Sequence, residues 1–170
     1  MSLEKHREHA AALTQIRCAI ITVSDSRTLD TDLSGKLLHD LVEEAGFEVS
    51  MRTVVPDDPK TIQDIIRREA RTADALLLTG GTGISERDNT IPALQGLLQE
   101  ELPGFGELFR ILSYGRIGSA AMLSRAAGGV YQGSLVFAMP GSPGGVKLAM
   151  EKLILPELPH LVAELKKGTG

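Results

Sequence analysis

The residues best suited to chemistry form one short run, Thr79-Gly80-Gly81-Thr82-Gly83, which follows an apolar segment and precedes Arg87-Asp88. Three glycines in five residues let the backbone turn sharply and bring bare N–H groups close to a ligand. The hydroxyls of Thr79 and Thr82 could donate to a phosphate or a ring heteroatom. The run matches neither the Rossmann fingerprint nor the Walker A pattern. It indicates phosphate or nucleotide contact in general, and a tight strand-to-helix turn is the alternative that the residues leave open.

Two aspartates, Asp57 and Asp88, each follow the end of an expected strand. Alone, Asp57 could cap a helix, but Asp58 stands directly before Pro59 and is better placed to do so. Alone, Asp88 could be a solvated residue paired with Arg87. At one rim of a sheet, however, the two carboxylates could together hold Mg²⁺ against triphosphate oxygens.

A second loop, Pro140-Gly141-Ser142-Pro143-Gly144-Gly145, follows another apolar segment. Pro143 stiffens the turn before a helix N-terminus that could face an anion. By itself this loop reads as structural.

Other chemistries find no support in the sequence. The four histidines, His6, His9, His39 and His160, have no metal-ligand spacing and read as surface residues. The single cysteine, Cys18, lies inside an apolar segment, which excludes an internal disulfide and gives no basis for a Cys-His site.

The elements that must position these residues alternate between strand and helix. We expect strands over residues 17–23, 47–55, 75–78 and 134–139, with 47–55 nearer an edge because it partly alternates. Polar or glycine-rich loops follow all four strands. Alternation of this kind is typical of right-handed βαβ crossovers and predicts a three-layer αβα fold with a mostly parallel sheet. Ligands bind such sheets beyond the carboxyl ends of the strands.

The expected helices follow from apolar stripes, caps and prolines. Ser34 is expected to cap a helix that ends at Gly46, and Asp58 to cap one that contains Ile62 to Ala70. Pro92 is expected to start a third helix. Residues 103–106 are expected to break the chain before a short helix over 107–112, and residues 118–125 to be helical or loop. Residues 128–133 are expected to form a turn, and two last helices to cover 146–154 and the residues after Pro156.

The whole chain has 170 residues and a net charge of −4 at pH 7, without a basic tract. We expect an N-terminal arm over residues 1–14 and a single domain over residues 15–170. The net negative charge and the small number of aromatic residues argue against nucleic acid as a partner. No segment resembles a signal peptide or a membrane span, so we expect a soluble cytoplasmic protein.

Five motifs in a fixed order carry a family likeness. The sequence resembles the MoaB/MogA family of molybdenum cofactor biosynthesis proteins from Arg17 to Leu165, and the run from Phe105 to Ser113 is most similar to the MoaB branch. The motifs are Thr79-Gly80-Gly81-Thr82-Gly83, Arg87-Asp88-x-Thr90-x-Pro92, Pro103-Gly104-Phe105-Gly106-Glu107, Met122-Leu123-Ser124-Arg125 and Met139-Pro140-Gly141-Ser142-Pro143.

The resemblance implies a reaction: the terminal phosphate of molybdopterin attacks the α-phosphorus of Mg-ATP, giving adenylyl-molybdopterin and pyrophosphate. It places the two essential aspartates, which are also the expected Mg²⁺ ligands, at Asp57 and Asp88. It places the adenine and phosphate loop at residues 79–83. Pterin-side contacts are implied near Ser24, Ser124 and Ser142, with Gly141 and Pro143 in the same loop.

The resemblance also implies a three-layer fold with one small antiparallel element, and a trimer or a hexamer built of trimers. Some family members lack one or both aspartates and are inactive, so a silent molybdopterin-binding or scaffold protein is the alternative function. Because this chain keeps both aspartates, the active enzyme is favoured. A related hydrolase of the competence-damage type is disfavoured, because it shows Gly-Gly-Leu-Gly-Pro-Thr where this chain has Gly-Gly-Thr-Gly.

Overall fold

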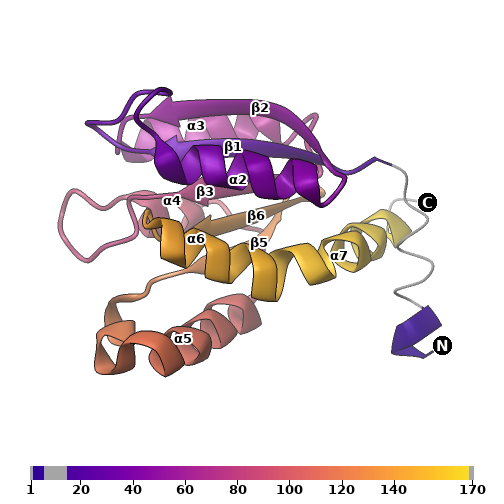
Figure 1. The fold of residues 1–170 in the computed structure, drawn as a ribbon. Coiled ribbons are helices and arrows are strands. Elements are labelled where there is room, and N and C mark those ends of the chain that lie inside the picture. The colour runs from indigo at the N-terminus through magenta and orange to yellow at the C-terminus, as the bar shows by residue number, and fades with distance from the viewer. Residues whose placement is uncertain (1, 6–14, 169–170) are drawn as a thin grey trace.

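The fold is a three-layer αβα sandwich around one six-stranded sheet (Figure 1). The computed structural model describes residues 2–5 and 15–168. The strands lie in the order β2-β1-β3-β6-β5-β4. They are β1 (Arg17–Val23), β2 (Glu48–Val55), β3 (Ala75–Thr79), β4 (Glu100–Glu101), β5 (Ala127–Tyr131) and β6 (Ser134–Met139). The first three and β6 run parallel, whereas β4 and β5 are antiparallel to their neighbours. This confirms the expected fold class and the edge position of β2.

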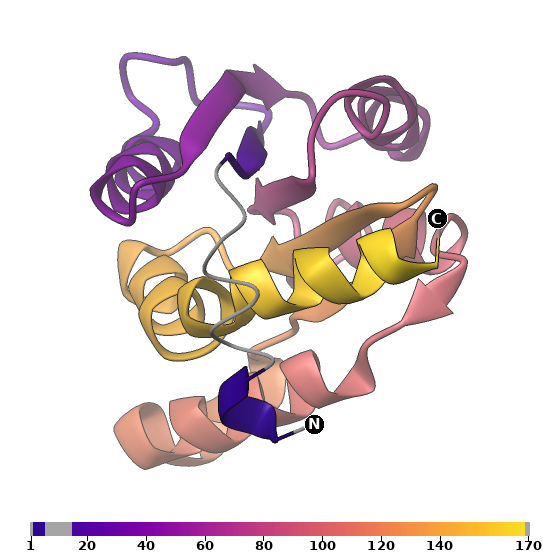
Figure 2. The ribbon, with the colours of Figure 1, turned by 90° about the vertical axis from the view of Figure 1, so that its right-hand side faces the viewer.

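Helices cover both faces of the sheet (Figures 1 and 2). One face carries α2 (Leu33–Glu44), α5 (Pro103–Ile117) and the run formed by α6 (Pro143–Ala149), the π-helical η2 (Met150–Ile154) and α7 (Leu155–Lys167). The other carries α3 (Pro59–Glu69) and α4 (Thr90–Gln95). A 3₁₀ helix, η1 (Gly118–Leu123), follows α5. No helix of the described ranges is long and apolar enough to cross a membrane.

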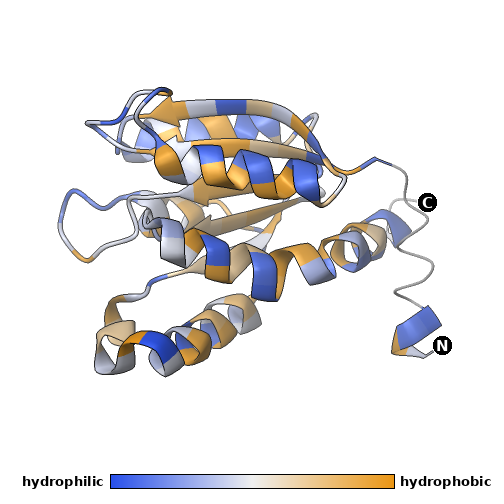
Figure 3. Ribbon diagram, in the orientation of Figure 1, coloured by the Kyte–Doolittle hydropathy of each residue, from blue (hydrophilic) through white to orange (hydrophobic). Residues whose placement is uncertain are grey.

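Alternation along the central strands divides the core into two clusters. Ile20 and Leu77 point to the α2 and α7 side, whereas Ile21 and Leu78 point to the α3 and α4 side. Every residue of β3 is buried, as the uninterrupted apolar segment predicts. Figure 3 shows the corresponding apolar colour along the sheet and mixed colour on the helices.

Two segments differ from the sequence expectation. Residues 103–106 begin α5 and do not break the chain, because Pro103 occupies the first turn, where its missing N–H is tolerated. Residues 127–131 form β5, and only Gln132 and Gly133, both with positive φ, make the hairpin turn. The glycines expected to mark a turn serve packing instead, since a Cβ on Gly128 would lie 2.8 Å from the Phe137 ring.

Three helix starts also differ. Asp32, and not Ser34, caps α2, and the Ser34 hydroxyl donates to the carbonyl oxygen of Gly141. The third helix begins at Thr90 and not at Pro92. The C-terminal helical run begins at Pro143. Asp58 caps α3 with Pro59 in the first turn, as predicted.

Part of the arm lies outside the described residues. Residues 3–5 form one helical turn with Leu3 exposed, but the apolar Ala10 to Leu13 patch is not among the described residues. The division into an arm over 1–14 and a domain over 15–170 stays a prediction.

A buried cap joins α2 to β1 and β2. The Asp32 side chain accepts hydrogen bonds from the Thr22 hydroxyl (2.7 Å), the Gly35 N–H (2.9 Å) and Arg52 (3.3 Å). It is only 2% exposed. These contacts fix the start of α2 beside the end of β1.

We expect Asp32→Ala to lower the free energy of unfolding by about 3 kcal/mol, because it removes a helix cap and leaves the Arg52 charge poorly paired. Denaturant unfolding measures the change. Asp40→Ala, which removes an exposed carboxylate of the same helix, is the matched control and should change stability far less, because solvent screens its ion pair with Lys36. Equal losses in the two variants would contradict the structural role of Asp32.

Candidate active site

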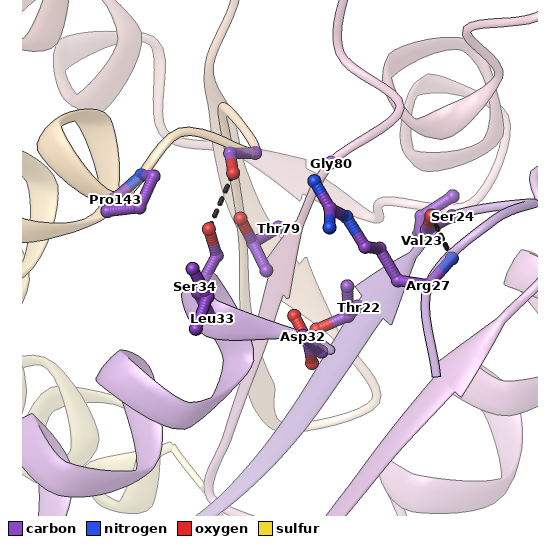
Figure 4. A pocket seen from close by; sticks show the side chains of 11 residues that line it. Thr22, Val23, Ser24, Arg27, Asp32, Leu33, Ser34, Thr79, Gly80 and Pro143 are labelled. Atoms are coloured by element: carbon purple, nitrogen blue, oxygen red, sulfur yellow. Dashed lines mark hydrogen bonds between the residues drawn. The ribbon is translucent and has the colours of Figure 1, made fainter. Parts of the chain in front are cut away.

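A cavity opens where β1 and β3 end side by side. The helices that follow the two central strands leave on opposite faces of the sheet, which is the arrangement that creates ligand sites in doubly wound folds. The cavity has a volume of about 190 Å³. Five of the sequence-predicted site residues line it (Figure 4): Ser24, Thr79, Gly80, Gly141 and Pro143.

The glycine loop is shaped by close backbone approach. Gly80 and Gly81 have φ values of 92° and 64°, which a residue with a side chain rarely adopts. A Cβ on Gly80 would overlap the Val23 carbonyl oxygen, and one on Gly81 would overlap the Thr90 hydroxyl and lie 2.9 Å from Asp57 Oδ2. The glycines therefore let β3 turn tightly against β1 and against the Asp57 carboxylate.

The threonine hydroxyls have partners within the protein. Thr79 Oγ1 donates to the Pro140 carbonyl oxygen at 2.8 Å, and Thr90 Oγ1 donates to the Gly80 carbonyl oxygen at 2.8 Å. Thr82 is buried. The Thr79 hydroxyl thus joins the glycine loop to the second loop, which differs from the donation to a ligand that the sequence suggested.

Asp57 follows β2 and points toward the glycine loop. Its Oδ1 accepts the Asn89 N–H at 2.9 Å, and its own N–H donates to Asp25 Oδ1 at 2.9 Å. Desolvation is the main cause that raises the pKa of Asp57, and the negative charges of Asp88 and Asp25 add to it, while the Asn89 hydrogen bonds oppose it. The carboxylate is therefore less stable as an anion here than in water.

Asp88 lies in the segment between the glycine loop and α4. Its Oδ2 accepts the Ser85 hydroxyl at 2.7 Å and the Ser85 N–H at 3.1 Å. The hydroxyl bond is the main cause that lowers the pKa of Asp88, and the Arg125 charge contributes. Asp88 thus stays ionised at neutral pH and, through its charge, acts on Asp57.

The pair of carboxylates fits a hard divalent cation that arrives with phosphate. Mg²⁺ is commonly held by one or two carboxylates together with phosphate oxygens of the substrate. Within residues 2–5 and 15–168, no group of three or more His, Cys, Asp or Glu side chains could hold a metal ion alone. Asp57 and Asp88 could each supply a carboxylate oxygen to a cation whose other ligands come from a phosphorylated substrate.

Two further predicted residues line a second cavity, of about 310 Å³, between α5 and the second loop. Ser124 and Ser142 both line it, beside Arg116. Ser142 also caps α6, because its Oγ accepts the Gly145 N–H at 3.2 Å. The predicted residues therefore fall into three neighbouring groups: the first cavity, the acidic pair at Gly81 and Gly83, and the second cavity.

Comparison with known proteins identifies the family. Residues 19–160 match the family model described as a probable molybdopterin binding domain. The chain belongs to this molybdopterin-binding family. Molybdenum cofactor biosynthesis protein B of Bacillus subtilis is 50% identical over 170 residues, which cover 98% of this chain and 99% of that protein. The family and the branch expected from the motifs are thereby confirmed.

Solved structures of the family have the same fold. A crystal structure of a molybdenum cofactor biosynthesis protein B matches with a TM-score of 0.89 and 52% identity, covering 92% of this chain and 99% of that one. The tungsten cofactor synthesizing protein MoaB from Pyrococcus furiosus matches with a TM-score of 0.83 and 34% identity, covering 91% and 99%. Membership thus places the chain among molybdenum cofactor biosynthesis proteins.

Sequence reasoning missed several polar residues at the site of this family member. Arg27 lines the first cavity, where Figure 4 shows its backbone N–H bonded to Ser24 and its side chain extending away from Ser24 into the cavity. Its guanidinium is the positively charged group of the cavity lining. Asp25 holds the Asp57 backbone, and Arg125 donates to the Gly83 carbonyl oxygen. The polar run Ser24-Asp25-Ser26-Arg27 at a strand end was a usable signal for the first two. Arg125 stands in the motif Met122-Leu123-Ser124-Arg125, but that motif did not indicate a contact with Gly83.

Cys18 has no part in this site. It is fully buried in β1, and burial, with the nearby charge of Asp74, raises the pKa of its thiol to about 12. The residue therefore stays a neutral thiol. His39 and His160 lie beside acidic side chains of their own helices, α2 and α7.

We expect Asp57→Asn to raise the melting temperature at pH 7 in the presence of EDTA. The folded protein binds the Asp57 proton more tightly than the unfolded chain does, so ionisation above the folded pKa destabilises the wild type, and asparagine removes this cost. As the pH falls below about 4, Asp57 is protonated in both states and the difference should vanish.

Asp58→Asn is the comparison. Hydrogen bonds from Thr61 lower the pKa of Asp58, so this substitution should change stability at pH 7 in the opposite direction. The electrostatic account of Asp57 fails if Asp57→Asn melts at or below the wild-type temperature at pH 7, or if the difference does not depend on pH.

Proposed function

We propose that the protein catalyses the Mg-ATP-dependent adenylylation of molybdopterin, with release of pyrophosphate. The observation that carries this proposal is that Asp57 and Asp88 both lie against the glycine loop. The Arg27 side chain lines the cavity beside this loop. Membership of the molybdopterin-binding family supports molybdopterin as the acceptor substrate, and the two carboxylates are groups that can hold the metal ion of a Mg-nucleotide.

The site suits a reaction that needs alignment and charge neutralisation more than proton transfer. The nucleophile, a terminal phosphate, is already an anion, so little general-base work is required. A Mg²⁺ ion bound with the triphosphate would neutralise charge on the departing pyrophosphate. The chain's own part is to hold the carboxylates through Asn89 and Ser85 and to present the glycine-loop backbone.

Local groups explain how a chain with net charge −4 could bind two anionic substrates. Arg27 lines the first cavity and Arg116 the second, so each predicted anion site has one cation. The backbone of residues 79–83 adds fixed partial charges that need no reorganisation during the reaction. A general basic surface is therefore unnecessary.

We expect Asp88→Asn to reduce pyrophosphate release from molybdopterin and Mg-ATP by about 100-fold or more, because a ligand of the cation that neutralises the leaving group is lost. A coupled pyrophosphate assay measures the rate. Asp64→Asn, an exposed carboxylate of α3 paired with Lys60, is the matched control and should keep the wild-type rate.

Full activity of a folded Asp88→Asn protein would remove Asp88 from the mechanism. Molybdopterin binding by the wild type without any pyrophosphate release would instead support the silent molybdopterin-binding or scaffold function. The same assay thus separates the two functions.

We also propose that the protein assembles as a trimer, or as a hexamer built of trimers, through the outer face of α5 and η1. Six of the ten exposed large hydrophobic residues of the described chain lie there. They are Leu108, Ile111, Tyr114, Ile117, Met122 and Leu123. An apolar face of this size is typical of an association surface, and a copy seated on it would border the second cavity, which Ile117 lines.

We expect Ile111→Glu to shift the protein from the mass of three or six chains to that of a single chain in multi-angle light scattering, because a charge is placed within the apolar face. Leu29→Glu, at another exposed leucine, is the control and should leave the mass unchanged. An unchanged mass for Ile111→Glu would exclude this face as the interface.

A further inference from the structure

The segment that carries Asp88 projects from the end of the sheet. Residues 82–88 follow the glycine loop and precede α4, and Figure 1 shows the connection between β3 and α4 extending away from the body of the fold. Ile84, Ser85, Glu86 and Arg87 are exposed. Few packing contacts are therefore available to fix the position of this segment.

The hydrogen bonds of Asp88 are internal to the segment. Its carboxylate accepts the Ser85 hydroxyl and N–H, and its N–H donates to the Ser85 carbonyl oxygen at 3.0 Å. These bonds orient the carboxylate within the segment. Asn89 ties the end of the segment to Asp57, because its N–H donates to Asp57 Oδ1 at 2.9 Å and its Nδ2 donates to the Asp57 carbonyl oxygen at 3.1 Å.

Arg125 supplies a connection at the other end of the segment, at Gly83. Its Nη1 donates to the Gly83 carbonyl oxygen at 3.1 Å. Among the described residues, this is the hydrogen bond that reaches residues 82–88 from outside the stretch 79–90. Gly83 in turn lies against Asp88, since a Cβ on Gly83 would be 2.6 Å from Asp88 Oδ2. The guanidinium, the glycine and the carboxylate form a continuous chain of contacts.

The backbone around Arg125 is itself well anchored. Its N–H donates to the Leu123 carbonyl oxygen at 2.9 Å, and its neighbour Ala126 is buried in the core cluster with Phe105 and Phe109. Arg125 is partly buried, so its guanidinium has little freedom to leave the loop. The Arg125 side chain therefore connects the projecting segment to a part of the chain that is packed in the core.

We infer that Arg125 is a positioning residue, which sets the place of Asp88 relative to Asp57 through its hydrogen bond to Gly83. The catalytic part of this inference rests on the proposed adenylyl transfer. Without the bond, Asn89 still holds the end of the segment at Asp57, but the Gly83 end loses its hydrogen bond to the body of the fold, and the Asp88 carboxylate that lies against Gly83 can change its position. Small misplacements of groups that align reactants reduce the rate of the chemical step strongly.

Arg125→Met tests the inference, because it keeps the length of the side chain and removes its donors. We expect kcat for pyrophosphate release to fall on the order of 10-fold to 100-fold, with KM for Mg-ATP changed less than about 3-fold. Arg125→Lys, which retains one charged donor, should recover part of kcat. Arg68→Met, at an exposed arginine of α3, is the matched control and should behave as wild type.

Hydrogen exchange provides a readout that does not depend on activity. In Arg125→Met, the amides of Ser85 and Asp88 should exchange on the order of 10-fold faster, while amides of β1 and β3 keep their wild-type rates. Faster exchange throughout the chain would indicate general destabilisation and would overturn the inference, as would unchanged exchange at Ser85 and Asp88. Faster local exchange with unchanged kcat would overturn the catalytic part alone.

The two proposals can fail separately. If the wild type releases no pyrophosphate, adenylyl transfer is excluded, and the exchange rates still decide whether Arg125 holds the segment. If the wild type is active and Arg125→Met equals it in kcat, adenylyl transfer stands and the catalytic role of Arg125 is excluded.

Discussion

The parallel pairing of β1 and β3, with both strands buried on both faces, is the constraint on which the rest of the structure depends. Because the two strands run in the same direction, their carboxyl ends lie together. The chain continues from β1 toward one edge of the sheet and from β3 toward the other, and the helices that follow lie on opposite faces. The resulting opening is the cavity that Thr79 and Gly80 line. The bare Cα atoms of Gly80 and Gly81 then let Val23 and Asp57 approach, so the acidic pair follows from the strand pairing.

Much of the fold could be predicted from the sequence because the relevant signals are local. Apolar segments gave the four parallel strands, and Asp58-Pro59 gave the start of α3. The errors occurred where tertiary packing decides the outcome. Gly128 and Gly129 look like turn residues, but they are strand residues that Phe137 and Leu98 press against. Ser34 looks like a cap, but the Thr22 hydroxyl and Arg52 draw Asp32 into that role.

The part of the candidate site that could be predicted consists of the residues that directly follow strands. Placing Asp57 and Asp88 on one rim required only the parallel sheet, and the structure brings both to the glycine loop. The destination of a hydroxyl or a guanidinium, in contrast, depends on residues far away in the chain. Thr79 bonds Pro140 across 61 positions, and Arg125 reaches Gly83 across 42. No local pattern encodes such pairs.

The bonds from Thr79 to Pro140 and from Ser34 to Gly141 divide the site into two parts with different conformational entropy. They tie β3, β6 and α2 together around the first cavity, so a ligand that enters it finds walls that are already ordered. Residues 82–88 are less constrained: within the described chain, the hydrogen bond that joins them to a distant part of the fold is the one from Arg125 to Gly83. The entropic cost of ordering on ligand binding therefore falls on the acidic segment, and affinity can change there while the cavity keeps its shape.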